Sequence, residues 1–499
     1  MSDCRERPWD PRLAPLLKRC AEIRDLNAAL AVLGWDQQVY MPSGAAEGRA
    51  RQLETLTVIV HEKSTDPAYG DLVREAAAMD FEPDSDEAAL VRRLERDLRK
   101  KQAVPAELAG RLARQTGETQ AAWEAAYAAS DFRLCADSLK KLLALEREYA
   151  DCFPEAGSRY NAMLDDYEEG LTTETLDRIV PPLKKGLETI LAEILAKPAP
   201  DDAFLHLDYD ADAQLAFCRR LTEAMGFDYI HGRLDLSTHP FTTDFGLDDV
   251  RITTRVRRNE PANCIFSCIH ECGHAMYQQG IAPKYAGTPL SDGASLAFHE
   301  SQSRFWENIL GRSPEFWRNF YPDLVRTFPA NLKDVPLDAF LRAVNRVQPS
   351  FIRTESDEVT YNLHIILRVE LEQALIEDKI SVDDLPEVWN DTFGRYFGIR
   401  PANDREGVLQ DVHWYSGGVG YFPTYMLGNL IGAMLKEQFF ASGLPETPHD
   451  ALAVLRDRIY RFGAKYAPSD FLRRLTGSAV PDPAPFLRYL REKHLGEAK

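Results

Sequence analysis

Amphipathic helical periodicity is the feature that most limits the fold of this chain. Asp84 and Glu87 are spaced as a capping box at the start of one helix. Apolar residues follow at helical spacing, namely Leu90, Val91, Leu94 and Leu98. Similar patterns recur in three further stretches, 104–130, 132–150 and 172–198. Charged residues fill the opposite face of each helix, so each needs a helical neighbour to bury its apolar side.

Strand signals are scarce by comparison. The best lies between His239 and Arg258, where residues 251–256 alternate and are rich in β-branched side chains. Gly246, Asp248 and Asp249 supply turn residues just before it, which suggests a hairpin. Helical patterns resume near residue 263. With no linker or repeat in the chain, the sequence predicts one mainly α unit over residues 1–499 with a small sheet near the middle.

Charge and cysteine usage limit the partners and the compartment. The formal net charge of −19 argues against nucleic acid, whose phosphates need clustered Lys and Arg. No run of about 18 apolar residues exists to span a membrane, and no apolar run follows the N-terminal charges as in a secretory signal. The eight cysteines lack the spacing of a disulfide framework. We therefore expect a cytoplasmic protein with free thiols.

The central motif is His270-Glu271-Cys272-Gly273-His274. Residues four apart share one face of a helix, so both imidazoles can bind one metal ion. The glutamate between them is not a ligand, and it can take a proton from a water that the metal activates. The pattern predicts a zinc-type hydrolase with Glu271 as general base. The alternative is two histidines at the edge of the core.

A catalytic zinc needs a third protein ligand. Asp292, His299 and Glu300 are the candidates, and residues 294–302 read as a second helix that could cross the first. His299 and Glu300 point about 100° apart on a helix, so we expect only one of them to coordinate. In the H-E-x-x-H-x-x-G-x-x-H pattern of some zinc peptidases, a third histidine ligand would stand at position 280 of this chain. Position 280 is Gly, which favours Glu300 as the third ligand.

A row of cysteines, Cys264, Cys268 and Cys272, lies on the same predicted helix. A thiolate metal site there is one interpretation. Buried small thiols are the favoured one, because zinc-ribbon and redox motifs use C-x2-C spacing.

The chain resembles the Taq-type thermostable metallocarboxypeptidases over nearly its whole length. The resemblance rests on ordered motifs: Trp35-Asp36, Met41-Pro42, Arg49 to Leu53, His239-Pro240-Phe241, Asp249 to Thr253, His270 to His274, His299 to Gln302, Ile352 to Asp357 and Gly407 to Trp414. Ser356 departs from the alanine that is usual at its position in the family.

The resemblance implies a single elongated helical catalytic unit with a deep groove, similar in shape to neurolysin and angiotensin-converting enzyme. Its helical part would cover about 1–230 and its metal-site part about 231–499. The resemblance also implies hydrolysis of C-terminal amino acids from peptides with broad specificity, dependence on zinc or cobalt, and homodimers.

Three further residues are candidates for substrate binding. Arg353 matches a peptide's C-terminal carboxylate, because a guanidinium can bind carboxylate bidentately. The alternative is a salt bridge to Glu355, Asp357 or Glu358, and the resemblance favours substrate. Arg251 and His239 are the other two candidates. The alternative is that Arg251 and Thr253 shape the sheet beside the groove, and a histidine before a proline, such as His239, is more often structural.

His413 and the segment after it offer groups to stabilise the oxyanion. A glycine-rich stretch, residues 417–420, leads to Tyr421, and Tyr425 is an equal rival if a helix begins at 421. Asp411 is a candidate to orient an imidazole from outside the ligand shell. The alternative is a plain turn, with Gln410 and Asp411 capping a helix.

We therefore predict a metal-dependent carboxypeptidase that acts on peptides. One alternative is an endo-acting oligopeptidase on the same fold. The other is a non-enzymatic helical scaffold with a vestigial metal site, which an intact Glu271 argues against.

Overall fold

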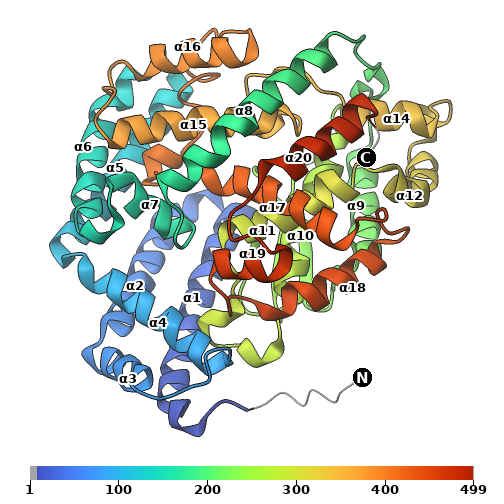
Figure 1. Cartoon of the computed structure of the whole chain (residues 1–499). Coiled ribbons are helices and arrows are strands. Elements are labelled where there is room, and N and C mark those ends of the chain that lie inside the picture. Colours follow the sequence, from blue (N-terminus) through green and yellow to red (C-terminus); the bar gives the residue numbers. More distant parts are fainter. Residues whose placement is uncertain (1–7, 498–499) are drawn as a thin grey trace. The chain divides into compact units, whose positions relative to one another are not determined.

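Residues 8–497, the part of the chain that the computed structural model describes, contain twenty α-helices and three short strands (Figure 1). The prediction of a mainly helical fold with a small sheet near the middle is confirmed. The chain forms two compact units, and each is assembled from three separate stretches. None of the described helices is both long and apolar enough to cross a membrane.

The first unit comprises residues 1–102, 201–344 and 435–471. Its helices are α1 (Ala14–Val39), α2 (Ala46–Thr65), α3 (Pro67–Ala77), α4 (Asp86–Ala103), α9 (Ala211–Met225), α10 (Pro261–Gln279), α11 (Leu296–Arg304), α12 (Pro314–Thr327), α13 (Pro329–Leu332), α14 (Leu337–Val344), α18 (Pro448–Arg458) and α19 (Pro468–Thr476), which continues past 471. Its strands are β1 (Gly232–Leu236), β2 (Thr242–Asp244) and β3 (Val250–Thr254).

The second unit comprises residues 103–200, 345–434 and 472–499. Its helices are α5 (Ala106–Ala129), α6 (Arg133–Ala150), α7 (Arg159–Tyr167), α8 (Thr173–Leu195), α15 (Thr360–Ile376), α16 (Leu385–Phe397), α17 (Pro423–Phe439), which ends in the first unit, and α20 (Pro483–Leu490). Helices α5, α6 and α8 confirm the three stretches predicted from periodicity.

Helix α4 confirms one sequence pattern and corrects another. Leu90, Val91, Leu94 and Leu98 are all buried, as their spacing predicts. The predicted capping box of Asp84 and Glu87 is wrong by one residue. Ser85 Oγ accepts a hydrogen bond from the Ala88 amide at 3.1 Å, so a hydroxyl caps this helix in place of the Asp84 carboxylate.

The sheet has the strand order β1-β3-β2. Strand β3 pairs in parallel with β1 and antiparallel with β2, with Ile252 opposite both Leu234 and Thr242. The β2–β3 pair is the predicted hairpin, and Gly246 in its turn has φ 141°, a region that favours glycine. Val250 and Ile252 are fully buried and β3 packs on α10, so the sheet supports the helix that carries the metal motif.

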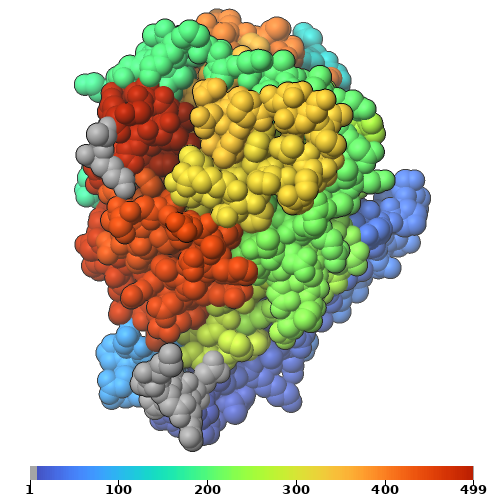
Figure 2. Space-filling view, turned by 90° about the vertical axis from the view of Figure 1, so that its right-hand side faces the viewer, coloured from blue at the N-terminus to red at the C-terminus, as the bar shows by residue number. Residues whose placement is uncertain are grey.

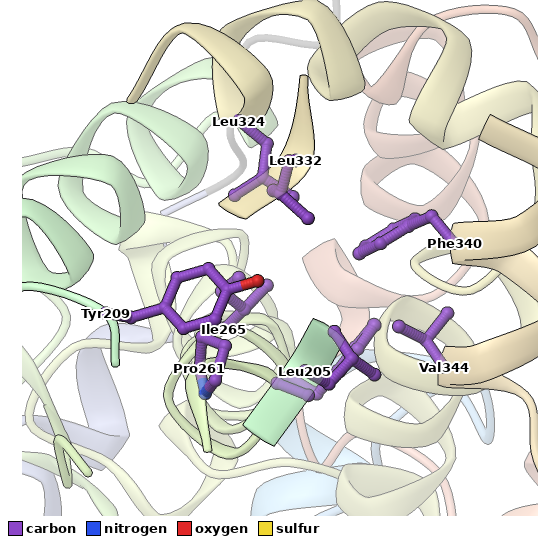
Figure 3. A pocket seen from close by; sticks show the side chains of 10 residues that line it. Leu205, Tyr209, Pro261, Ile265, Leu324, Leu332, Phe340 and Val344 are labelled. Atoms are coloured by element: carbon purple, nitrogen blue, oxygen red, sulfur yellow. The ribbon is translucent and has the colours of Figure 1, made fainter. Parts of the chain in front are cut away.

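The first part of α10 is held in an apolar environment. Pro261 begins the helix, where a missing backbone N–H costs no hydrogen bond. Figure 3 shows Pro261 and Ile265 lining a small apolar pocket with Tyr209, Leu324 and other side chains from α12 to α14. Helix α12 also contacts the chain near α18, where Asn319 Nδ2 donates to the Glu446 carbonyl at 2.6 Å (Figure 2, yellow beside orange). The side chains of the pocket thus hold the N-terminal part of α10.

Candidate metal centre

The two histidines of the central motif lie one turn apart on α10. His270 Nε2 lies 3.7 Å from Glu300 Oε2, and His274 Nε2 lies 3.5 Å from the same oxygen. The three ligand atoms lie within 4.8 Å of one another. The histidine side chains are 18% and 19% exposed and that of Glu300 is 7% exposed, so solvent reaches the group from one side.

Glu300 reaches this position because α10 and α11 approach closely. Ser295 starts α11, its Oγ accepting from the Phe298 amide at 3.1 Å. A Cβ at Gly273 would lie 2.8 Å from Ser303 Cα, closer than carbon atoms can pack. Glycine inside the motif is therefore what lets the two helices cross here.

Glu307 binds the outer nitrogen of His270. His270 Nδ1 donates to Glu307 Oε2 at 2.9 Å, so Nε2 is the ring nitrogen that faces Glu300. Glu307 lies in a π-helical turn, Phe305–Leu310, that directly follows α11. Sequence analysis missed Glu307, because the π-helical turn breaks the 3.6-residue register that places side chains on a face.

His299 binds the outer nitrogen of His274. The two Nδ1 atoms are 3.1 Å apart, so one ring donates and the other accepts. Burial, together with repulsion from His274, lowers the pKa of His299 to about 3, so His299 is neutral and can accept. The prediction that His299 and Glu300 point in different directions agrees with this geometry.

The electrostatics keep both carboxylates ionised. Burial acts to raise the pKa of Glu300, but Arg304, His270 and His274 outweigh it and hold the pKa well below its usual range. Arg304 Nε donates to Glu300 Oε1 at 2.6 Å, which leaves Oε2 for the histidine side. Burial likewise opposes ionisation of Glu307, yet Arg304 and His270 lower its pKa.

Glu271 lies beside this group and makes a different contact. Thr242 Oγ1 on β2 donates to Glu271 Oε2 at 2.6 Å and also approaches the Glu271 carbonyl at 2.9 Å. Glu271 is buried. The hydroxyl fixes one carboxylate oxygen and leaves the other available. Thr242 was not singled out from the sequence, although it directly follows the His239-Pro240-Phe241 element.

The donor set fits a divalent metal ion. Two imidazole nitrogens and one carboxylate oxygen form the His₂Glu set of many catalytic zinc sites, which leave further positions open. Both imidazoles are oriented by hydrogen bonds at their other nitrogens, as metal-binding histidines usually are.

The other sequence candidates near the motif have other partners. Asp292 accepts from Arg24 Nη1 at 2.8 Å and is not part of the group. Cys264 and Cys268 cluster with Cys218 of α9, and Cys272 of the same predicted row is not in that cluster.

Arg251 and His239 lie on the sheet side of the first unit. Arg251 on β3 is bound to Asp249 at 2.8 and 2.7 Å, and its guanidinium lies 4.3 Å from the ring centre of Trp35. His239 has an exposed side chain, and its carbonyl accepts from Ser237 Oγ. Asp249 and Trp35 thus hold the Arg251 guanidinium in place, and Ser237 holds the backbone at His239.

In the second unit, Arg353 binds Asp411. The alternative to substrate binding was a salt bridge to Glu355, Asp357 or Glu358. The structure shows a salt bridge to Asp411, in which Arg353 Nε and Nη2 donate to Asp411 Oδ1 at 3.0 and 2.7 Å. Arg368 Nε donates to Asp411 Oδ2 at 2.6 Å. Two buried guanidinium groups thus share one carboxylate, which leaves one positive charge in excess.

Gln410 and Asp411 do not cap a helix. Gln410 Oε1 accepts from the Arg353 amide at 3.0 Å, so both side chains position the segment around Arg353. The two residues are 57 and 58 positions from Arg353 in the sequence. Only the fold brings them together.

His413 lies among tyrosines in the same unit. Helix α17 begins at Pro423, so Tyr421 precedes it and Tyr425 is in its first turn. His413 Nε2 lies 3.2 Å from Tyr425 Oη, and the His413 and Tyr421 rings are 5.3 Å apart. Burial lowers the pKa of His413 to about 4, so it is neutral near pH 7.

The chain is similar to known proteins over nearly its whole length. The model of the carboxypeptidase Taq (M32) metallopeptidase family matches residues 15–494. Thermostable carboxypeptidase 1 of Thermus thermophilus is 40% identical over 95% of this chain and 97% of its own length. The Pyrococcus furiosus protein of the same name is 38% identical over 96% and 98%. The crystal structure of an M32 carboxypeptidase from Deinococcus radiodurans R1 superimposes with a TM-score of 0.94 at 37% identity, covering 97% of this chain and 99% of that one.

Proposed function

Because this chain belongs to the carboxypeptidase Taq (M32) metallopeptidase family, and is therefore a metal-dependent carboxypeptidase, we propose that His270, His274 and Glu300 hold its metal ion. Glu271 is the proposed general base. The scaffold and endopeptidase alternatives are not supported by any of these relatives.

One observation carries the ligand assignment. Both outer imidazole nitrogens are occupied, by Glu307 and His299, so both Nε2 atoms are directed to the same Glu300 oxygen. Such an arrangement leaves three lone pairs converging on one point, and without a cation there the group would gain little from being assembled.

The chemistry follows from where each group points. A divalent ion, when bound, supplies Lewis acidity to the scissile carbonyl and to the attacking water. Glu271 takes the proton of that water and passes it to the leaving amine, which a carboxylate beside the ligand group can do. Thr242 holds the Glu271 carboxylate in one orientation throughout. Glu307 and His299 keep the two imidazoles from rotating away from the ion.

Recognition of the substrate's C-terminus is proposed for Arg353. The excess positive charge of Arg353, Arg368 and Asp411 supports it, because a buried cation in an acidic protein favours an anionic partner. His413 and Tyr421 are proposed to stabilise the oxyanion, with Tyr425 as the rival of Tyr421. Arg251 and His239 are proposed to contribute to substrate binding from the sheet. The proposed activity is the release of single C-terminal amino acids of varied type from peptides.

Four finer properties are proposed on the resemblance. The metal is zinc, with cobalt as a substitute, because a His₂Glu set of borderline ligands suits either. The enzyme is cytoplasmic and forms homodimers, and residues 1–499 act as one catalytic domain.

The ligand set is tested by metal content. The protein is stripped with a chelator, reloaded with zinc or with cobalt, and freed of excess ion. Wild type should retain one ion per chain, whereas His270→Ala and Glu300→Ala should retain almost none. Asp292→Ala is the matched control, a nearby acidic residue outside the group, and should load like wild type. Full loading of the Glu300→Ala variant would overturn the assignment.

A further inference from the structure

Three cysteines form a second cluster of potential ligands in the first unit. Cys218 comes from α9, and Cys264 and Cys268 come from successive turns of α10. Their sulfur atoms lie within 4.8 Å of one another, and Cys218 Sγ and Cys264 Sγ are 3.6 Å apart. Three sulfurs bound to one ion at about 2.3 Å are roughly 3.7–4.0 Å apart. The thiols are therefore already close to the spacing of a common coordination shell.

This cluster is separate from the proposed catalytic centre. At about 100° per residue, the Cys264–Cys268 pair lies roughly 120° around α10 from the His270–His274 pair. All three cysteines are fully buried. Thr254 Oγ1 lies 3.8 Å from Cys264 Sγ and 2.8 Å from Ser267 Oγ, so hydroxyl groups adjoin the sulfurs.

The number of ligands argues against a structural zinc ion. Structural zinc sites are almost always four-coordinate, whereas this cluster has three members among the residues that the structure describes. Three thiolates around a divalent ion would also leave a net charge of −1, and burying an uncompensated charge is costly. A trivalent ion with three thiolates is neutral.

We propose that Cys218, Cys264 and Cys268 form a binding site for trivalent arsenic, a thiophilic element that the three thiols bind together. Arsenous acid has three As–OH bonds and the site has three S–H groups. Each S–H proton leaves with one hydroxide as water, and three As–S bonds replace three As–O bonds. Three waters are released, the oxidation states do not change, and the product carries no net charge.

Arsenite also gives a clean test, because it binds thiols and has little affinity for the imidazole and carboxylate donors of the other centre. The metal-loaded enzyme is incubated with arsenite and freed of excess reagent, and arsenic is counted per chain. Incubation lasts hours, because buried thiols are reached through local opening. Wild type should bind one arsenic per chain, and Cys218→Ala should bind at least tenfold less at the same concentration.

Cys272→Ala is the matched control. Cys272 is another fully buried thiol of α10, outside the cluster, so this variant should bind like wild type. Arsenic X-ray absorption of the wild-type complex gives the number of bound sulfurs and does not depend on any variant folding. Three sulfurs per arsenic would support the site. Two sulfurs, no binding by wild type, or undiminished binding by Cys218→Ala would overturn it.

Discussion

Nδ1 of His274 lies 3.1 Å from Nδ1 of His299, so two adjacent imidazoles share one proton between them. His299 is neutral in this environment and can accept that proton's hydrogen bond. This hydrogen bond gives His299 a role that its neighbour Glu300 does not have: it sets which nitrogen of His274 faces Glu300.

His299→Ala should therefore weaken the metal site without removing it. Loss of such an outer partner typically costs about 10–100-fold in metal affinity. The variant should load fully when the ion is in excess and lose it at lower chelator concentration than wild type, as a chelator titration would show. Equal ion loss from His299→Ala and Glu300→Ala would instead make His299 a ligand.

Thr242 should matter for turnover and not for metal content. Thr242→Val removes the hydroxyl that donates to Glu271 at 2.6 Å while keeping the side-chain shape. Turnover should fall by about tenfold, because a hydrogen bond to a charged group contributes about 1.5 kcal/mol. Thr243→Val, on the same strand, is the control. Unchanged kcat in the Thr242 variant would exclude a role in orienting the base.

Arg353 should decide whether the enzyme distinguishes a free C-terminus from an amide. Wild type should cleave the free acid far faster, because the amide removes the charge and keeps the scissile bond. Arg353→Ala should slow on the acid alone, by about 2–5 kcal/mol for a desolvated pair. Arg353→Lys should recover only part of that loss, since a point charge cannot bind bidentately.

Arg400→Ala, which removes an exposed arginine of the same unit, is the control and should keep the full preference. A wild type that prefers the acid, with an Arg353→Ala variant that still does, would place carboxylate recognition elsewhere.

Glu146 should make stability depend on pH. Burial, with repulsion from Asp166, raises the pKa of Glu146 to about 8. The folded state thus holds a proton that the unfolded state releases near pH 4.5. The stability from that proton is complete below pH 4.5 and is lost as pH rises towards 8, by a few kcal/mol at order of magnitude.

Glu146→Gln keeps the shape and cannot ionise. Its melting temperature should therefore fall less than that of wild type between pH 5 and pH 8. If the melting temperatures of the two proteins fell equally between pH 5 and pH 8, Glu146 would not be the source of the pH dependence of stability.

Local periodicity accounts for what could be predicted from the sequence. The spacing of His270 and His274 places both on one face of a helix wherever the helix lies, and the alternation of 251–256 gives β3 and its hairpin. Glu300 was identified as a candidate because α11 was recognisable as a helix.

What could not be predicted depends on contacts between distant segments. Asp411 is 58 residues from Arg353, and Cys218 is 46 residues from Cys264. Glu307 lies on a turn whose helical register differs from that of α11. Neither a pattern nor a spacing records such pairings, which follow only from the packing of whole helices.

The most direct test of the account is a single substitution, Glu271→Gln, with bound metal and turnover measured on the same preparation. The substitution removes a base and leaves all three proposed ligands in place. It should retain one ion per chain and lose turnover by roughly 10²–10⁴, the usual contribution of a general base. A Glu271→Gln variant that carries the metal and still turns over within about tenfold of wild type would contradict the account.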